Sequence, residues 1–136
     1  MTVRRSHRPA AALMLALAVT LVFSSPTNAI PLGVGVMRHG FCDPGPSHWR
    51  LRVLPDPVDA QQLIVRFALT GGTPGDTWNL FLDHNGTGFF AGSRVSGDLG
   101  FVRVGRRTPD ATGIDVIRAA GHNVTTGEIC RGWVQI

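Results

Sequence analysis

The sequence predicts an all-β fold, an antiparallel sandwich of about seven strands, from three observations. Apolar and polar residues alternate with period two in several short stretches, which is typical of strands with one buried face. Turn sequences rich in Gly, Pro, Asn and Asp recur roughly every 10 residues between these stretches. No stretch of residues 30–136 shows a convincing helical period. Short strands at this spacing favour two packed sheets.

The first strands show the alternation most clearly. Trp49, Leu51 and Val53 alternate with arginines, and the stretch ends at Pro55. A second apolar face follows at Leu63, Val65, Phe67 and Leu69. Later strands are expected around Trp78–Leu82 and at Leu99–Val104, Ile114–Ala120 and Ile129–Ile136.

Asn85-Gly86 gives the strongest local signal, a β-hairpin, because both residues tolerate positive φ in a two-residue turn. Such a turn pairs His84 with Thr87. Counting outwards, the expected pairs are Leu82 with Phe89, Phe81 with Phe90, and Leu80 with Ala91. A calcium loop in Asp83–Gly88 is the alternative, but its glycine falls too early for an EF-type loop.

Residues 1–29 have the three parts of a secretory signal peptide, expected as a helix. Three arginines precede an apolar run at Ala10–Phe23, and Thr27 and Ala29 are small residues before a cut at Ile30. An uncleaved membrane anchor is the alternative, but spanning a bilayer takes about 20 apolar residues. We therefore expect a secreted, extracellular protein, exported by the general or the twin-arginine route.

Removal of this leader changes the charge of the protein. The chain has no lysine, and three of its 13 arginines lie in the leader, whereas all nine acidic residues follow it. Ten arginines against nine acids leave a net charge of +1. A nucleic-acid partner requires a clustered basic excess, so no nucleic-acid partner is expected.

The segment 30–47 is rich in Gly and Pro and is expected to be irregular, ahead of a sandwich domain at 48–136. Cys42 in this segment and Cys130 near the end are expected to form a disulfide, because exported proteins oxidise paired cysteines. The alternatives are a reactive thiol or a metal site, for which His39 and His48 are the nearby candidates. No metal or other cofactor is expected.

The residues offer little for catalysis. Without lysine there is no Schiff base, no P-loop lysine and no Ser-Lys dyad. Neither a Gly-x-Ser-x-Gly elbow nor a His-Glu-x-x-His helix is present. A carboxylate pair of the kind glycosidases use cannot be assembled from sequence. No catalytic residue is predicted, and an enzyme is not expected.

Two features suggest a binding surface. If Trp78, Leu80 and Leu82 face inward, Phe81 and Phe90 pair on the outer face, and Arg131 and Trp133 face outward as well. Aromatic residues with arginine are typical of binding surfaces. Alternatively, segment 30–47 covers the pair or a β-bulge redirects one phenylalanine, and these alternatives are favoured. A set of outward arginines would contact anionic wall polymers or form a solvated face: Arg50, Arg52, Arg66, Arg103 and Arg118.

Four short sequences carry a resemblance to a known group: Gly72–Trp78, Asn85-Gly86, Gly113–Asp115 and Thr126–Cys130. They resemble small secreted actinobacterial proteins of unassigned function, over roughly residues 49–136. The resemblance implies an immunoglobulin-like β-sandwich and an extracellular location, and no activity. A weaker likeness is to secreted carriers of antitumour antibiotics, which have two disulfides where this chain has at most one. Secreted subtilisin inhibitors of similar size also have two disulfides, so the chain differs from them in the same way.

The sequence therefore predicts a secreted, non-enzymatic binding or interaction module of the cell wall or medium. Its partner is unknown, with a wall polymer or another extracellular protein as candidates. A small-ligand carrier with a cleft between the sheets is the first alternative. A hydrolase is the second, and it would require a convergent His/Asp/Ser cluster.

Overall fold

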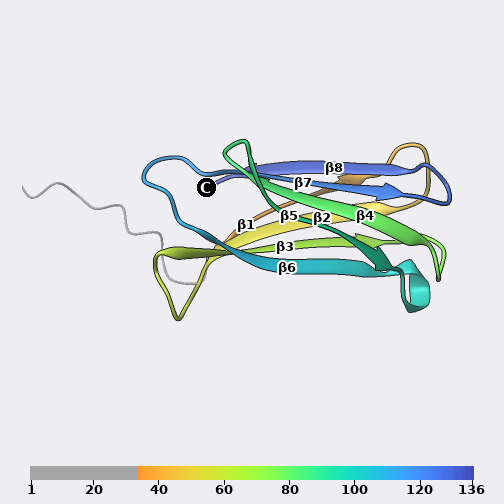
Figure 1. Cartoon of the computed structure of the whole chain (residues 1–136), viewed down its shortest axis with the longest axis horizontal. Coiled ribbons are helices and arrows are strands. Elements are labelled where there is room, and N and C mark those ends of the chain that lie inside the picture. Colours follow the sequence, from red (N-terminus) through yellow and green to blue (C-terminus); the bar gives the residue numbers. More distant parts are fainter. Residues whose placement is uncertain (1–33) are drawn as a thin grey trace, which may run out of the picture.

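The structure is a computed structural model that describes residues 34–136. It contains two antiparallel sheets of four strands packed face to face, so the predicted β-sandwich is confirmed (Figure 1). The predicted signal peptide and residues 30–33 lie outside the described residues, and the immunoglobulin-like assignment stays a prediction. No helix in residues 34–136 is long and apolar enough to cross a membrane.

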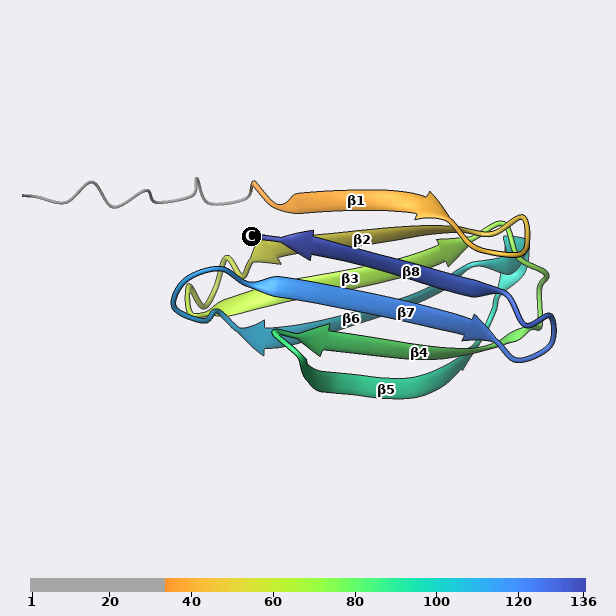
Figure 2. The same cartoon turned by 90° about the horizontal axis from the view of Figure 1, so that it is seen from above.

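Eight strands make up the described part of the chain: β1 (Val36–Phe41), β2 (His48–Pro55), β3 (Gln62–Thr70), β4 (Thr77–His84), β5 (Thr87–Val95), β6 (Val102–Pro109), β7 (Val116–Asn123) and β8 (Ile129–Gln135). A short 3₁₀ turn, η1 (Asp98–Gly100), precedes β6. One sheet has the order β1-β2-β3-β6 and the other β5-β4-β7-β8. Strand β6 crosses back to pair with β3 (Figure 2). Arginines distant in sequence therefore come to share one sheet.

The core lies between the two inner faces. The predicted alternation is confirmed in β2, β3 and β4, whose inward side chains are almost fully buried. Trp78 and Phe67 are the largest of them, at 0 % and 1 % exposure. Burying side chains of this size supplies the main driving force for folding. The space between the sheets is thus filled by side chains.

The expectation of an irregular segment 30–47 is wrong for Val36–Phe41, which forms β1 and pairs antiparallel with β2. Gly40, one of the glycines that suggested a loop, has a packing role instead. A Cβ atom on Gly40 would lie 2.8 Å from the Trp49 ring, and one on Gly132 of β8 would lie 2.3 Å from it. The glycines therefore let the indole pack closely against β1 and β8 at this end of the core.

The predicted disulfide is confirmed: Cys42, directly after β1, is bonded to Cys130 of β8. It connects the two sheets at one edge of the sandwich. Beside it, the carboxylate of Glu128 is buried and accepts hydrogen bonds from the backbone N and the Oγ of Ser47, both at 2.8 Å. The β1–β2 connection is thus held to the start of β8 by covalent and polar contacts.

The Asn85-Gly86 hairpin is present, with φ of 50° and 87° at its two turn residues. The predicted pair His84–Thr87 is confirmed. Beyond it the register shifts at a β-bulge between Leu82 and Asp83, so that Leu82 lies opposite Phe90 and not Phe89. The other two expected pairs are wrong for the same reason, since Phe81 faces Ala91 and Leu80 faces Gly92.

Candidate functional site

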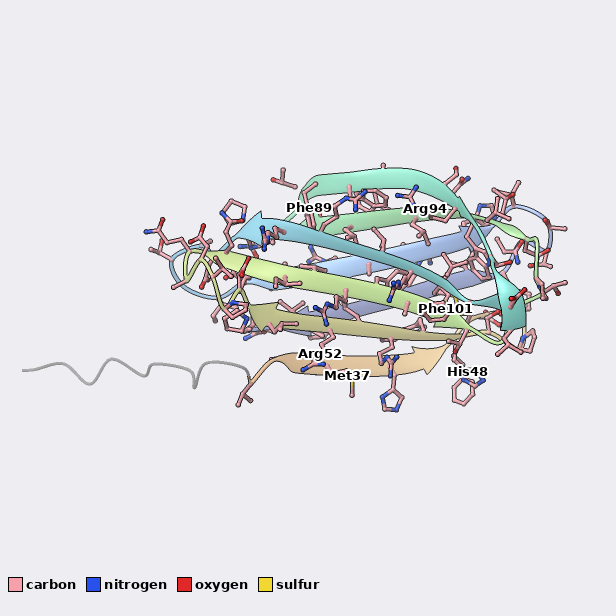
Figure 3. All side chains as sticks on the ribbon, turned by 90° about the horizontal axis from the view of Figure 1, so that it is seen from below. Met37, His48, Arg52, Phe89, Arg94 and Phe101 are labelled. Atoms are coloured by element: carbon pink, nitrogen blue, oxygen red, sulfur yellow. A yellow bond between two sulfur atoms is a disulfide. The ribbon has the colours of Figure 1, made fainter. Side chains whose placement is uncertain are left out.

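The outer face of the β1-β2-β3-β6 sheet carries a concentration of positive charge. Strand alternation directs Arg50, Arg52, Arg66 and Arg103 outward, because the residues between them fill the core. Arg94 of β5 and Arg106 of β6 join them from the edge of the sandwich. We call these six residues the arginine face. Figure 3 shows this side of the molecule, with Arg52 and Arg94 labelled.

The arginine face lines a shallow groove of about 630 Å³. All six arginines border it, and no acidic side chain does. Met37, Ala68, Phe101 and Gly105 supply less polar parts of its floor and walls. The groove is therefore a concave surface with one sign of charge, the arrangement that concentrates counter-ions of the opposite sign.

The register shows how closely the charges are placed. Arg52 on β2 lies directly opposite Arg66 on β3. In the adjacent row, Ala68 lies between Arg50 on β2 and Arg103 on β6. Like charges on facing strand positions repel and destabilise a sheet. The arginines on these strands therefore repel one another in the folded protein, and a bound anion would relieve the repulsion.

Acidic residues lie elsewhere. Asp83 is the only one of the nine acidic residues that lies within a strand, and the others occupy loops, turns and strand ends. Two ion pairs join arginines to carboxylates in the described residues: Arg107 with Asp56, and Arg118 with Asp83. Neither arginine belongs to the arginine face, so the six charges there have no carboxylate partner within residues 34–136.

The edge arginines pack on an aromatic ring. The guanidinium of Arg106 lies 4.4 Å from the centre of the Phe90 ring, and that of Arg94 lies 5.7 Å from it. Such cation–π contacts hold the charge without neutralising it. The Nη1 atoms donate to the carbonyls of Gly105 and Ser93, the residues that precede each arginine.

This clustering corrects one step of the sequence argument. A net charge of +1 suggested that no clustered basic excess exists, whereas the fold gathers six arginines on one side and leaves all of the acids except Asp83 outside the strands. Arg50, Arg52, Arg66 and Arg103 were expected to face outward and do so together; Arg118 also faces outward, on the other sheet. The expectation of no nucleic-acid partner stays a prediction, but the absence of a basic cluster no longer supports it.

Sequence reasoning missed Arg94 and Arg106, as well as the part played by Ala68. Alternation places Arg106 on the inner face of β6, in phase with Val104 and Thr108. An arginine at an inward position was a signal that the sandwich is open at that edge. The position of Ala68 between two arginines follows only from the pairing of β3 with β6, which the sequence does not show.

The predicted aromatic pair does not form. Phe81 faces outward on β4 and is 44 % exposed, but the bulge turns both Phe89 and Phe90 toward the core, against which they are half-buried. The β-bulge alternative is therefore confirmed. The ring of Phe90 instead lies beneath Arg94 and Arg106 of the arginine face.

Arg131 and Trp133 lie on the outer face of the β5-β4-β7-β8 sheet, as the sequence predicts. Trp133 is 47 % exposed, and the guanidinium of Arg38 on β1 lies 4.6 Å from the centre of its ring. A second groove of about 540 Å³ on this side is lined by Phe81 and Arg131 around Ala120. Trp133 is not among its lining residues, although it lies two residues from Arg131 on the same face of β8. Of the four predicted patch residues, Phe90 is the one that packs toward the core instead.

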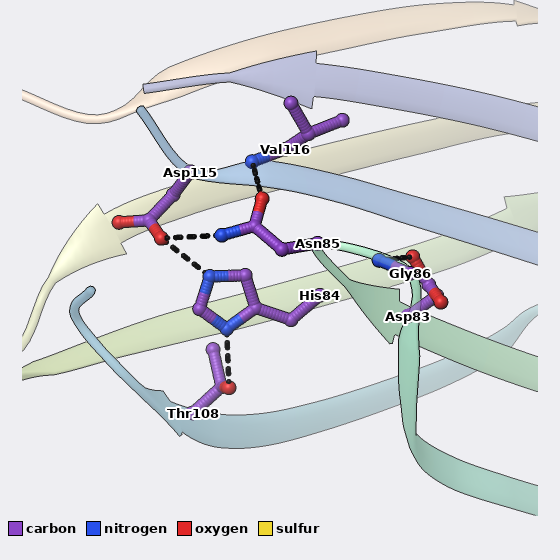
Figure 4. Close-up of polar contacts among 7 residues, drawn as sticks. All are labelled: Asp83, His84, Asn85, Gly86, Thr108, Asp115 and Val116. Atoms are coloured by element: carbon purple, nitrogen blue, oxygen red, sulfur yellow. Dashed lines mark hydrogen bonds and ion pairs between the residues drawn. The ribbon is translucent and has the colours of Figure 1, made fainter. Parts of the chain in front are cut away.

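A convergent polar cluster does exist at one end of the sandwich (Figure 4). The imidazole of His84 contacts Thr108 Oγ1 through Nδ1 at 2.9 Å and Asp115 Oδ1 through Nε2 at 2.5 Å. Asn85 donates to the same carboxylate oxygen at 3.3 Å and accepts from the backbone N of Val116 at 2.8 Å. A hydroxyl, an imidazole and a carboxylate in series resemble a catalytic triad in connectivity.

The burial of this cluster indicates a structural role. Thr108 is 4 % exposed and Asp115 is 1 % exposed, so a substrate could not reach the hydroxyl. None of the three residues lines the grooves described above. Asp115 also exchanges two backbone hydrogen bonds with Ile136, each at 3.0 Å. The contacts tie the β4–β5 hairpin, the β6–β7 loop and the C-terminal residue together.

Asp110 lies beside this cluster. Its pKa is raised above the ordinary value, first by burial and then by a hydrogen bond with Asp115 and repulsion from that carboxylate, while His84 acts in the opposite direction. Asp83, considered above for calcium, accepts from the backbone N of Gly86 at 3.0 Å and is paired with Arg118. No cluster of metal-ligating side chains is found among residues 34–136.

Comparison with known proteins gives no relative: no family model, no curated protein and no solved structure matches the chain. The resemblance to small secreted actinobacterial proteins therefore stays a prediction.

Proposed function

We propose that the protein is an exported, non-enzymatic binding module whose arginine face binds an anionic polymer of the cell wall or medium. The observation that carries this proposal is the groove bordered by six arginines and no acid. Guanidinium groups form charge-assisted hydrogen bonds with carboxylates and phosphates, which are among the strongest polar contacts in proteins. A polymer would engage several of them at once.

Export is part of the proposal and is supported by two observations. The leader has the charged, apolar and small-residue parts of a signal peptide. The Cys42–Cys130 disulfide suits an oxidising compartment. The intact mass of the protein recovered from culture medium tests it: we expect the mass of residues 30–136, less about 2 Da for the disulfide. Recovery only from cells, with the leader attached, contradicts export.

The alternatives receive less support. A carrier needs a cleft between the sheets, where Trp78 and Phe67 are buried instead. A hydrolase needs an accessible nucleophile, and the hydroxyl of Thr108 is buried. Neither is proposed.

Binding to a soluble polyanion tests the proposed function. We expect dextran sulfate to bind and uncharged dextran of equal length not to bind, as measured by isothermal titration calorimetry. Because exposed charges are screened by salt, the affinity should fall steadily between about 0.05 and 0.5 M NaCl. Unchanged affinity across this range would refute an electrostatic interaction.

Substitutions locate the binding face. The double variant Arg50→Gln/Arg103→Gln should lose roughly tenfold or more in affinity, the equivalent of about 1.4 kcal/mol. Arg118→Gln/Arg131→Gln is the matched control, because it removes two exposed arginines from the outer face of the other sheet. Equal losses in both variants would show that binding follows net charge and not the arginine face.

A further inference from the structure

Ala68 forms a hollow at the centre of the arginine face. It is the outward residue of β3 between Arg50 on one neighbouring strand and Arg103 on the other. Arg66 lies two residues earlier on the same strand and so on the same face. Strands about 4.8 Å apart place the Cα atoms of Arg50 and Arg103 about 10 Å from each other, across the methyl group of Ala68.

From this arrangement we propose that the hollow over Ala68 is a seat for a single phosphate group, and that the polymer bound by the protein is a phosphate-bearing one. The inference rests on the proposed function and specifies its ligand. Arginines approach the seat from three strands, namely β2, β3 and β6. Each carries a planar fork of N–H donors that matches two oxygens of an anion.

The geometry favours phosphate over carboxylate. A carboxylate has two oxygens in one plane, and a single guanidinium fork satisfies both. A phosphate group directs its oxygens tetrahedrally, so it can accept from several forks that arrive from different directions. Three arginines around one small residue supply those directions, whereas a carboxylate would leave donors unused.

The surroundings favour a polymer over a free ion. A smaller groove of about 290 Å³ shares Met37, Arg50 and Ala68 with the groove of the arginine face and continues toward His39 and His48. The seat therefore lies where the two grooves adjoin. Thr70 and the imidazoles there offer further hydrogen-bonding groups for the units between charges.

Filling the hollow tests the seat while every arginine is kept. The variant Ala68→Leu places a larger side chain where the phosphate would lie. Ala120→Leu is the matched control, since Ala120 is an outward alanine on a central strand of the other sheet, between Phe81 and Arg131. The probe is tripolyphosphate, compared with citrate as a multivalent carboxylate, and binding is measured by calorimetry at low salt.

We expect wild type to bind tripolyphosphate at least tenfold more tightly than citrate. Ala68→Leu should lose at least tenfold in tripolyphosphate affinity, and Ala120→Leu should bind as wild type does. Unchanged thermal unfolding of both variants shows that they are folded. If Ala68→Leu unfolds at lower temperature, Ala68→Ser, which keeps the hollow, must retain binding while Ala68→Val loses it.

The outcomes separate this inference from the proposed function. If Ala68→Leu binds tripolyphosphate normally, or citrate binds as tightly as tripolyphosphate, the phosphate seat is wrong. The proposed function would still stand if Arg50→Gln/Arg103→Gln has a lower affinity for dextran sulfate than wild type has. If that double variant binds dextran sulfate as wild type does, the proposed function itself is wrong.

Discussion

The arginine face should lower the stability of the unliganded protein, and Arg66→Gln measures by how much. Arg66 has Arg52 directly opposite on β2, and Arg50 and Arg103 as diagonal neighbours on either side. Removal of its charge relieves three repulsions and breaks no ion pair. The substitution should therefore stabilise the fold and weaken anion binding at the same time.

The register gives the magnitude. Two unit charges in water repel by about 0.7 kcal/mol at about 6 Å, the opposite position, and by about 0.5 kcal/mol at about 8 Å, the diagonal position. After screening, the three repulsions total about 1.4 kcal/mol at about 0.01 M salt, about 0.7 kcal/mol at about 0.15 M, and about 0.2 kcal/mol at about 1 M. Long side chains can splay apart, which lowers these values.

The assay is urea unfolding of wild type and Arg66→Gln at the three salt concentrations. We expect a higher free energy of unfolding for the variant at low salt, a gain that shrinks as salt is added, and unchanged m values. Arg131→Gln serves as control, since its outward neighbour Arg118 is already paired with Asp83. A variant that is less stable than wild type at every salt concentration would refute the reasoning.

Two further predictions concern the framework of the fold. Replacement of Cys42 and Cys130 together by alanine opens a loop of 88 residues. Loop entropy predicts that the free energy of unfolding, measured with urea, falls by about 4.6 kcal/mol. A fall below about 1 kcal/mol, or equal stability of reduced and oxidised wild type, would show that the disulfide constrains the unfolded chain little. Because its pKa is raised in the folded protein, Asp110 stabilises the fold only when protonated, and this contribution is lost as pH rises through the raised pKa. Asp110→Asn should therefore have a slightly higher melting temperature than wild type at neutral pH, and the gain should disappear below the ordinary value of 3.8; a gain independent of pH would contradict this origin.

Local patterns were enough to predict much of the architecture. The alternation around Leu51 and Val65 predicts strands because a half-buried strand has side chains on opposite faces in turn. The Asn85-Gly86 turn follows from backbone preference alone. The disulfide follows from the number of cysteines and the expected compartment. Each inference depends on residues close in sequence or on simple counting.

Other features were outside the reach of such patterns. The bulge after Leu82 adds one residue to β5, which moves Phe90 from the expected outer face to the core side. Strand β1 forms because β2 and the ring of Trp49 offer it a partner, although its own segment is rich in glycine and proline. Tertiary contacts override local propensity at both places.

The sequence by itself determined that the chain forms a β-sandwich with one disulfide and that its arginines alternate with core residues. Only the tertiary structure decided which arginines are neighbours. Arg103 lies beside Ala68 because β6 crosses the sandwich to pair with β3, a pairing between segments more than 30 residues apart. Charge counts do not depend on strand order, whereas an electrostatic field does, and so a chain with a net charge of +1 carries a strongly cationic face.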